Sequence, residues 1–310
     1  MTDFNALAGK RVFVTGGTGF IGSHLLDRLS EVGARVYAVS RDHQPDRSPA
    51  IRWYQADVAE LPTTRTLFEA IKPHVVYHLA SHVVGTRSAD AIVPTFQSNL
   101  MTTVNLLTVA QVVGCERFVL PGSLEEPSSG GTDVVPSSPY AATKWASSAY
   151  ARMFHALYQL PIVILRVFMV YGPAQGDVKK LIPYVIRSVL NGDVPTFSSG
   201  QRPIDWIYVD DVVEALLASA LADNLEGKTI DIGSGSVETV RTLVEKLVGL
   251  MGSDIVPLFG ARSDRPLEQV SIADTKAAEE LLGWTPKVSL DEGLKRTIAW
   301  YGQDLGVSAS

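Results

Sequence analysis

Residues 12–22 read Val12-Phe13-Val14-Thr15-Gly16-Gly17-Thr18-Gly19-Phe20-Ile21-Gly22. The apolar run predicts a strand, and Gly16, Gly19 and Gly22, three residues apart, predict a tight turn that opens a helix. Glycine also lets backbone N–H groups and a helix N-terminus come close to a pyrophosphate. A purely structural turn is the alternative. The strand before the loop and the helix after it favour dinucleotide binding.

Outward from this loop, short β-branched runs alternate with longer helical patterns up to about residue 168. Several runs are apolar on both faces, which is typical of parallel βαβ units whose sheet is covered by helices on each side. We therefore predict an α/β fold built on a Rossmann-type doubly wound parallel sheet. The predicted strands are Arg11–Thr15, Arg35–Val39, Ile51–Gln55, Val75–Leu79, Arg117–Leu120 and Ile162–Val167. The predicted helices are Ser23–Glu31, Thr63–Ile71, Pro94–Val113 and Pro139–Leu160.

The second half of the chain has a different pattern. We expect residues 1–168 to form the dinucleotide-binding domain, with 205–232 returning to it, and 169–204 and 233–310 to form a smaller α/β substrate lobe. A substrate cleft is expected between the two parts. The elements expected here are strands Ile204–Val209 and Thr229–Ile232 and helices Lys179–Leu190, Asp211–Ala222, Val237–Leu250 and Leu290–Tyr301.

Composition excludes several classes of function. A net charge of −6 argues against a partner that is nucleic acid or an anionic membrane. The single cysteine, Cys115, excludes an intrachain disulfide framework and a cysteine-rich zinc site. His78 and His82 have no partner at metal-ligand spacing, so we expect core or cofactor-pocket roles and no metal. The N-terminus shows no secretory signal, and Arg166 interrupts the longest apolar stretch, so we predict a cytoplasmic protein.

A tyrosine and a lysine lie four residues apart in Ser138-Pro139-Tyr140-Ala141-Ala142-Thr143-Lys144. On a helix they share one face, and an ammonium beside a phenol stabilises the phenolate. The spacing alone also arises by chance on solvated helices. Together with the glycine loop and Ser123, at the end of a predicted strand, it predicts a nicotinamide-dependent carbonyl/alcohol redox site.

The end of the second strand bears on the choice of nicotinamide. An acidic residue there binds the 2′-hydroxyl of NAD, whereas arginine accommodates the 2′-phosphate of NADP. This chain has Ser40 and Arg41, followed by Asp42. NADP(H) is therefore favoured, and NAD(H) stays open because Asp42 is close. Asp57, at the end of the third strand, is either an adenine partner or a turn residue.

These segments resemble the extended short-chain dehydrogenase/reductase family, in particular its nucleotide-sugar epimerase, dehydratase and ketoreductase group. The resemblance runs from Arg11 to about Tyr301. It implies a Rossmann domain, a substrate lobe, a bound NAD(P), a nucleotide-diphosphate sugar as substrate and a homodimer. The motifs that carry it are Thr15–Gly22, His78–Ser81, Tyr140–Lys144, Tyr171-Gly172-Pro173, Asp205–Asp211 and Leu282-Gly283-Trp284.

The resemblance also implies roles for individual residues. Ser123 would hydrogen-bond the reacting oxygen, Tyr140 would be the acid/base, and Lys144 would bind the nicotinamide ribose and lower the tyrosine pKa. Asn99 matches a family asparagine near the cofactor, or it is a structural amide inside a helix. The remaining cofactor-binding candidates are Gly16, Thr18, Gly19, Phe20, Ile21, Gly22, Ser40, Arg41, Asp57, Val58, Leu79, Ala80, Ser81 and Val167.

Departures from the family pattern indicate which of the family's reactions this chain is expected to catalyse. The strand end reads Gly122-Ser123-Leu124-Glu125-Glu126 and continues Pro127-Ser128, where the family has Tyr-Gly. Typical 4,6-dehydratases carry a donor where this chain has Leu124, and only the base, Glu125, is kept. The sequence instead resembles the keto-sugar reductases. Leu124, with Ser123, is a substrate-binding candidate.

Two further departures affect the diphosphate contacts. Met169 stands where the family has asparagine, and Ile204 stands where it has arginine. Arg202 and Arg265 remain as candidate diphosphate ligands, or they are surface charges. A small ketone without a diphosphate therefore stays open as a substrate.

The leading hypothesis is NADPH-dependent reduction of a 4-keto-(deoxy)sugar linked to a nucleotide. The alternatives are an NAD-dependent 4-epimerase, with dehydratases and decarboxylases behind it, and a non-catalytic NADP-binding scaffold. We also expect a homodimer through helices Pro94–Val113 and Pro139–Leu160. Its predicted apolar stripe on the second helix is Trp145, Ala149, Met153 and Ala156.

Overall fold

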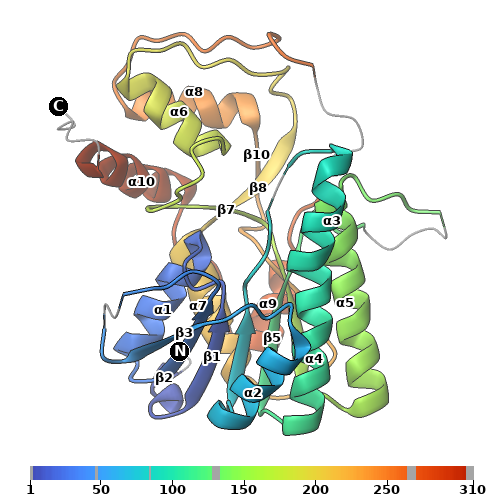
Figure 1. The fold of residues 1–310 in the computed structure, drawn as a ribbon. Coiled ribbons are helices and arrows are strands. Elements are labelled where there is room, and N and C mark those ends of the chain that lie inside the picture. The colour runs from blue at the N-terminus through green and yellow to red at the C-terminus, as the bar shows by residue number, and fades with distance from the viewer. Residues whose placement is uncertain (1–2, 46–47, 84, 128–132, 264–269, 305–310) are drawn as a thin grey trace. The chain divides into compact units, whose positions relative to one another are not determined.

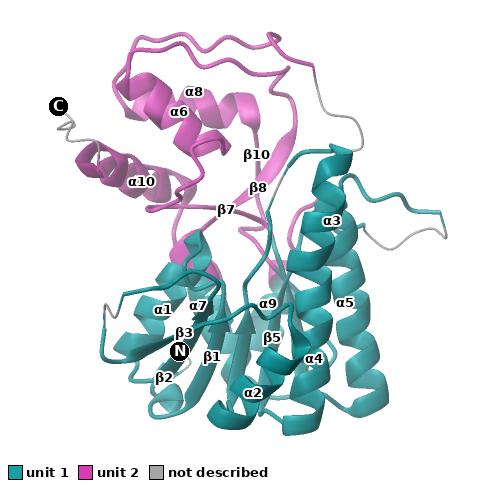
Figure 2. Cartoon of the chain, in the orientation of Figure 1, with its two compact units in different colours: residues 1–167, 213–231, 276–284 teal, residues 168–212, 232–275, 285–310 magenta. Residues whose placement is uncertain are grey.

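The computed structural model describes residues 3–45, 48–83, 85–127, 133–263 and 270–304. The chain divides into two compact units (Figure 2). Unit 1 comprises residues 1–167, 213–231 and 276–284, and unit 2 comprises 168–212, 232–275 and 285–310. Residues 205–212, which we expected to return to the first domain, lie in unit 2, and residues 276–284 lie in unit 1.

A seven-stranded sheet forms the centre of unit 1 (Figure 1), in the order β3-β2-β1-β4-β5-β6-β9. The ladders from β3 to β6 are all parallel, which confirms the predicted fold class. The strand order reverses direction between β1 and β4, and such a switch point is where doubly wound sheets bind ligands. The strands are β1 (Arg11–Thr15), β2 (Arg35–Ser40), β3 (Ile51–Gln55), β4 (Val75–His78), β5 (Arg117–Ser123), β6 (Ile162–Val167) and β9 (Thr229–Ile232).

Helices α2 (Leu61–Ile71), α4 (Thr102–Val113) and α5 (Pro139–Tyr158) lie side by side over one face of this sheet (Figure 1). The core under them is aromatic and aliphatic. Phe13 of β1 and Phe68 of α2 are both fully buried, with ring centroids 4.8 Å apart. Burying each such side chain stabilises the fold by about 1.5–3 kcal/mol. Unit 1 also contains α1 (Phe20–Glu31) and most of α7 (Val209–Leu221) and α9 (Thr275–Leu282), both of which begin in unit 2.

The start of α5 is fixed by its sequence. The Ser138 hydroxyl oxygen accepts a hydrogen bond from the Ala141 N–H over 3.1 Å, and Pro139 occupies the first helical turn. Both features are strong helix-start signals. They set the register that carries Tyr140 and Lys144.

The expected single helix Pro94–Val113 is wrong in detail. The chain forms a 3₁₀ turn, η2 (Ala89–Ala91), then α3 (Ile92–Thr95), then a π-helix, η3 (Phe96–Met101), before α4 begins. Periodicity does not separate a wide helical turn from a regular one, because the apolar positions shift by one residue only. The Thr103 hydroxyl donates to the Asn99 carbonyl over 2.6 Å where the wide turn passes into α4.

Unit 2 contains a three-stranded sheet in the order β10-β8-β7. The Asp205 carboxylate in β8 accepts hydrogen bonds from the backbone N–H groups of Ser234, Gly235 and Ala273, which fixes two loops to the sheet. Here the expected helix Val237–Leu250 is present but begins later: residues 237–239 form a strand, and Thr239 caps the helix that follows. The elements are β7 (Met169–Tyr171), β8 (Pro203–Tyr208), β10 (Val237–Thr239), α6 (Leu181–Leu190), α8 (Val240–Leu250) and α10 (Leu290–Asp304).

Candidate active site

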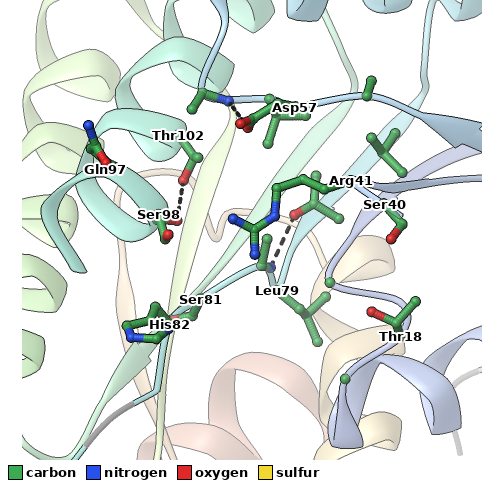
Figure 3. Close-up of a pocket in the computed structure, with 18 of the residues that line it drawn as sticks. Thr18, Ser40, Arg41, Asp57, Leu79, Ser81, His82, Gln97, Ser98 and Thr102 are labelled. Atoms are coloured by element: carbon green, nitrogen blue, oxygen red, sulfur yellow. Dashed lines mark hydrogen bonds between the residues drawn. The ribbon is translucent and has the colours of Figure 1, made fainter. Parts of the chain in front are cut away.

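A cavity of about 510 Å³ lies in unit 1 at the carboxyl ends of β1, β2 and β4 (Figure 3). Its size is within the range of small-molecule and cofactor sites. Of the cofactor-binding candidates, those that line it are Gly16, Thr18, Gly19, Ser40, Arg41, Asp57, Val58, Leu79, Ala80 and Ser81. His82, expected in the core or the cofactor pocket, and Asp42, the acid that kept NAD(H) open, also line it. Lining residues that were not among the cofactor candidates are Thr15, Val39, Ala56, Ala59, Glu60, Gln97, Ser98, Met101 and Thr102.

The glycine loop fits a pyrophosphate. Gly16 has a φ of +75°, and a Cβ there would lie 2.5 Å from the Ala80 nitrogen. A Cβ on Gly22 would collide with the Gly16 carbonyl oxygen. Gly19 caps α1 without a side-chain hydrogen bond, so no side chain covers the first N–H groups of this helix. An anion can therefore approach the backbone N–H groups and the positive end of the helix dipole directly.

The end of β2 carries the residues expected to select the nicotinamide. The Ser40 hydroxyl oxygen accepts the Asp42 N–H over 3.2 Å, and the Arg41 side chain reaches over the cavity (Figure 3). Asp57, on the neighbouring strand end, accepts the Ala59 N–H over 2.9 Å. Asp57 therefore caps its own turn and also lines the cavity.

His78 joins the end of β4 to its neighbours. Its Nδ1 lies 2.7 Å from the Thr15 hydroxyl and its Nε2 lies 3.0 Å from the Thr103 hydroxyl. Burial, together with the charge on Lys144, lowers the pKa of His78 to about 3. The imidazole is thus neutral at physiological pH and acts as a hydrogen-bonding support for the cavity wall.

Asn99 links the cavity to α5. Its Oδ1 accepts the His82 N–H over 2.6 Å, and its Nδ2 donates to the Thr143 hydroxyl over 3.1 Å. Thr143 precedes Lys144 and follows Tyr140 by three residues. The buried amide therefore fixes the cavity wall relative to the helix that carries the redox candidates.

The Tyr140 and Lys144 side chains lie on one side of α5, with the lysine Nζ 6.0 Å from the tyrosine ring centroid. Burial lowers the pKa of Lys144 to about 8, and the Glu126 charge opposes that shift. Burial raises the pKa of Tyr140, as do the charges of Glu125 and Glu126, whereas a hydrogen bond with the Ser123 side chain lowers it. The structure thus brings Ser123, Tyr140 and Lys144 into one cluster, next to Asn99 and His78.

The two glutamates after β5 differ in environment. Glu125 is half-buried and its N–H donates to the Ser123 hydroxyl oxygen over 3.2 Å. Glu126 is buried, and its Oε1 accepts the Ser123 N–H over 2.7 Å. Sequence reasoning gave a role only to Glu125, because nothing in two adjacent glutamates shows which one points inward. Leu124 is buried, and its N–H donates to the carbonyl of Val167.

The other predicted residues are distributed as follows. Phe20, Ile21 and Gly22 form the first turn of α1. In unit 2, Met169 is half-buried at the start of β7, Ile204 is buried in β8, and Arg202 precedes β8. Arg265 lies outside the described residues. A second cavity, of about 330 Å³, lies in unit 2 and is lined by Trp206, Glu238 and Pro286, among others. Trp206 and Glu238 are the strand partners of Met169 and Ile204.

Among the described residues, no group of three or more histidines, cysteines or acids is arranged to hold a metal ion. In the same part of the chain, no helix is both long and apolar enough to cross a bilayer.

Comparison with known proteins gives a consistent result. Residues 12–233 match the family described as "NAD dependent epimerase/dehydratase family". The UDP-glucose 4-epimerase of Mycolicibacterium smegmatis is 31% identical over 313 residues, covering 94% of this chain and 98% of that protein. The dTDP-glucose 4,6-dehydratase of Haemophilus influenzae is 28% identical, covering 94% and 97%. The structure of Thermotoga maritima UDP-glucose 4-epimerase with UDP-glucose superposes with a TM-score of 0.86, at 29% identity, covering 95% of this chain and 99% of that one.

Proposed function

Because this chain belongs to the NAD-dependent epimerase/dehydratase family, in the extended short-chain dehydrogenase/reductase group, we propose that it epimerises C4 of a nucleotide-linked sugar. The observation that carries the proposal is the complete set of Ser123, Tyr140 and Lys144 in a chain similar to UDP-glucose 4-epimerases along nearly its full length. The epimerase therefore replaces the ketoreductase as the first candidate.

The residues of the chain supply the proton chemistry. Tyr140 would take the proton of the C4 hydroxyl and later return it, while the Ser123 hydroxyl donates a hydrogen bond to the same oxygen. Burial raises the pKa of Tyr140. In this proposal the Lys144 ammonium, whose Nζ lies 6.0 Å from the tyrosine ring centroid, would stabilise the phenolate. A nicotinamide in the cavity would supply hydride exchange at the carbon.

A 4,6-dehydratase is disfavoured by the end of β5. The elimination of water from C6 needs an acid and a base, and the position of the family's acid is held by Leu124, which is buried and apolar. Glu125 alone provides only the base. The similarity to dehydratases therefore supports the family of this chain without indicating its reaction.

NADPH-dependent reduction of a 4-keto-(deoxy)sugar is the second candidate, and one observation favours it. Arg41 reaches over the cavity from the end of β2, where the residue before it is serine rather than an acid. This arrangement suits the 2′-phosphate of NADP. A reductase must release its oxidised cofactor after each turnover, whereas an epimerase regenerates it in place.

A nucleotide-diphosphate sugar is the proposed substrate class. In unit 2 the positions of Met169 and Ile204 offer no polar donor, so the proposed diphosphate contacts fall to Arg202 and Arg265.

A homodimer is proposed as well. Phe96 in η3 and Trp145 in α5 are 47% and 40% exposed, while Met153 of the expected stripe packs against the core of unit 1. Cytoplasmic location stays a prediction.

The test combines cofactor identification with an assay. The dinucleotide that co-purifies is identified by mass spectrometry, and UDP-glucose, UDP-glucuronate and dTDP-glucose are then incubated with the protein without added cofactor. Proton NMR of the C4 epimer gives the result. Conversion with retained NAD supports the epimerase. Turnover of a 4-keto sugar only with stoichiometric NADPH would replace it by the reductase, and neither reaction in any substrate would contradict both.

A further inference from the structure

A buried acid stands directly behind the redox cluster. Glu126 follows the end of β5 and is only 6% exposed. Its Oε1 accepts the Ser123 N–H over 2.7 Å, and its own N–H donates to the Ser123 carbonyl over 3.0 Å. The two residues therefore hold each other through one side-chain and one backbone hydrogen bond.

The space for this carboxylate depends on a glycine. A Cβ on Gly122 would lie 2.5 Å from Glu126 Oε1 and 3.3 Å from Cγ2 of Ile164. Any other residue at position 122 would therefore press on the carboxylate. The chain thus leaves room for an ionisable group where an apolar side chain would avoid the cost of burying a charge.

Two cations face the carboxylate. Arg166, in β6, has its own partner, because its Nη1 lies 3.1 Å from Asp231 Oδ1. Lys144, in α5, donates to a neutral group, the Pro121 carbonyl, over 2.9 Å. The Lys144 charge is therefore the one that the Glu126 carboxylate is best placed to balance.

The titratable groups around this pair are few. Glu126 is faced by Lys144, Arg166 and Tyr140, and Lys144 is faced by Glu126, Tyr140 and the buried His78. Burial raises the pKa of Glu126 and lowers the pKa of Lys144 to about 8, and each charge opposes the shift of the other. His78 is neutral at physiological pH, so it adds no charge to this balance.

We infer that Glu126 is a positioning residue of the redox site, which fixes Ser123 through its backbone N–H and holds Lys144 in the ammonium form. The inference rests on the proposed function, because Ser123 and Lys144 are the groups it serves. A merely structural role, in which Glu126 only caps the turn after β5, would also explain its bond to Ser123. The two roles differ in whether the charge of residue 126 reaches Lys144.

The decisive variant is Glu126→Gln, which keeps an oxygen for the Ser123 N–H and removes the charge. Without the carboxylate, the Lys144 ammonium loses the opposite charge that opposes the lowering of its pKa, so the pKa of Lys144 must fall further. The titration is followed by NMR on protein labelled with ¹³Cε-lysine, and the Lys144 signal is assigned by its loss in Lys144→Arg. Glu116→Gln, at an exposed glutamate paired with Lys10, is the control and should leave the signal unchanged.

An unchanged Lys144 titration in folded Glu126→Gln would reduce Glu126 to a turn cap and overturn the inference. If that variant does not fold, the native protein gives a second reading. The ¹³Cδ signal of Glu126 must then respond at the pH at which Lys144 loses its proton, and a flat signal would overturn the inference equally. Both readings are independent of turnover. A shifted Lys144 pKa with no sugar conversion would therefore refute the proposed function and leave this coupling standing.

Discussion

The Lys144 ammonium donates a hydrogen bond to the Pro121 carbonyl over 2.9 Å, which joins α5 to the strand that ends in Ser123. Proline is tolerated here because the ladder between β4 and β5 ends at Val119, so Pro121 removes no hydrogen bond from that ladder. The same strand therefore positions both side chains: Lys144 is held at Pro121, and Ser123 follows two residues later.

Burial of Lys144 should make the free energy of unfolding depend on pH. The pKa of Lys144 is lowered from 10.5 to about 8 in the folded chain, so between these values the unfolded state binds more protons and the free energy of unfolding rises with pH. Lys144→Met lacks this contribution. The difference in unfolding free energy between native protein and variant should therefore grow by up to about 3 kcal/mol from pH 7.5 to 10.5. Urea denaturation at several pH values measures it, and a constant difference would refute the lowered pKa.

Loss of the Tyr140 hydroxyl should affect turnover far more than cofactor binding. Tyr140→Phe keeps the ring and removes the acid/base, so turnover should fall by about two to four orders of magnitude. Dinucleotide affinity, measured by fluorescence titration, should stay close to native. Tyr150→Phe, at an exposed position of the same helix, is the matched control. Full activity in Tyr140→Phe on its true substrate would sink the assignment.

Cofactor preference should respond to the end of β2. Ser40→Asp combined with Arg41→Asn should weaken NADPH and strengthen NADH by on the order of 1.5–3 kcal/mol, because a charged hydrogen bond to the 2′-phosphate is lost. Arg35→Asn, at the exposed start of the same strand, should change neither affinity. Equal affinity of the native protein for both cofactors would argue against any role of Arg41 in the choice.

The glycine loop should not accept a side chain. Gly22→Ala places a Cβ against the Gly16 carbonyl, so the turn must open, and dinucleotide binding should fall at least tenfold together with the melting temperature. Gly249→Ala lies inside α8, where a Cβ would meet no atom within 4 Å outside the helix's own backbone. This substitution should instead be neutral or stabilise by about 0.5–1 kcal/mol. Calorimetry with and without NAD compares the two. Native-like binding in Gly22→Ala would show that the loop does not approach the pyrophosphate.

The proposed homodimer predicts a mass of two chains by light scattering at micromolar concentration. Phe96→Glu or Trp145→Glu should shift it to one chain, because each places a charge in an apolar contact. Val256→Glu, at a 79% exposed valine in unit 2, should leave the mass unchanged. A native mass near the single-chain value would exclude the dimer outright.

Strands such as Arg11–Thr15 and Ile162–Val167 were predicted to the residue because they are short, rich in β-branched residues and almost wholly buried. The edge strand Ile51–Gln55 was also predicted to the residue, although Arg52 and Gln55 are exposed. Elements whose limits depend on tertiary contacts were not. Strand β10 is three residues long and exists only by pairing with β8, so residues 237–239 resemble the first turn of the helix that follows.

The candidate site divides in the same way. Spacing identifies Tyr140 and Lys144, because helical geometry fixes which face they share. The orientation of Glu126 depends instead on the turn after Ser123 and on the absence of a side chain at Gly122. Neither leaves a signature in the sequence, since Glu125 and Glu126 are chemically identical.

The π-helix Phe96–Met101 positions Asn99 through the number of residues in its turn rather than through the chemistry of its side chains. Its wide turn contains one residue more than a regular turn, and each residue rotates an α-helix by about 100°. Deleting a single residue between Phe96 and Asn99 would leave α4 intact, yet it would remove the wide turn and strain the bonds of Asn99 to His82 and Thr143. In descendants of this gene, indels are therefore expected to be tolerated in the loops of unit 1 and purged from this one segment, even where substitutions accumulate freely.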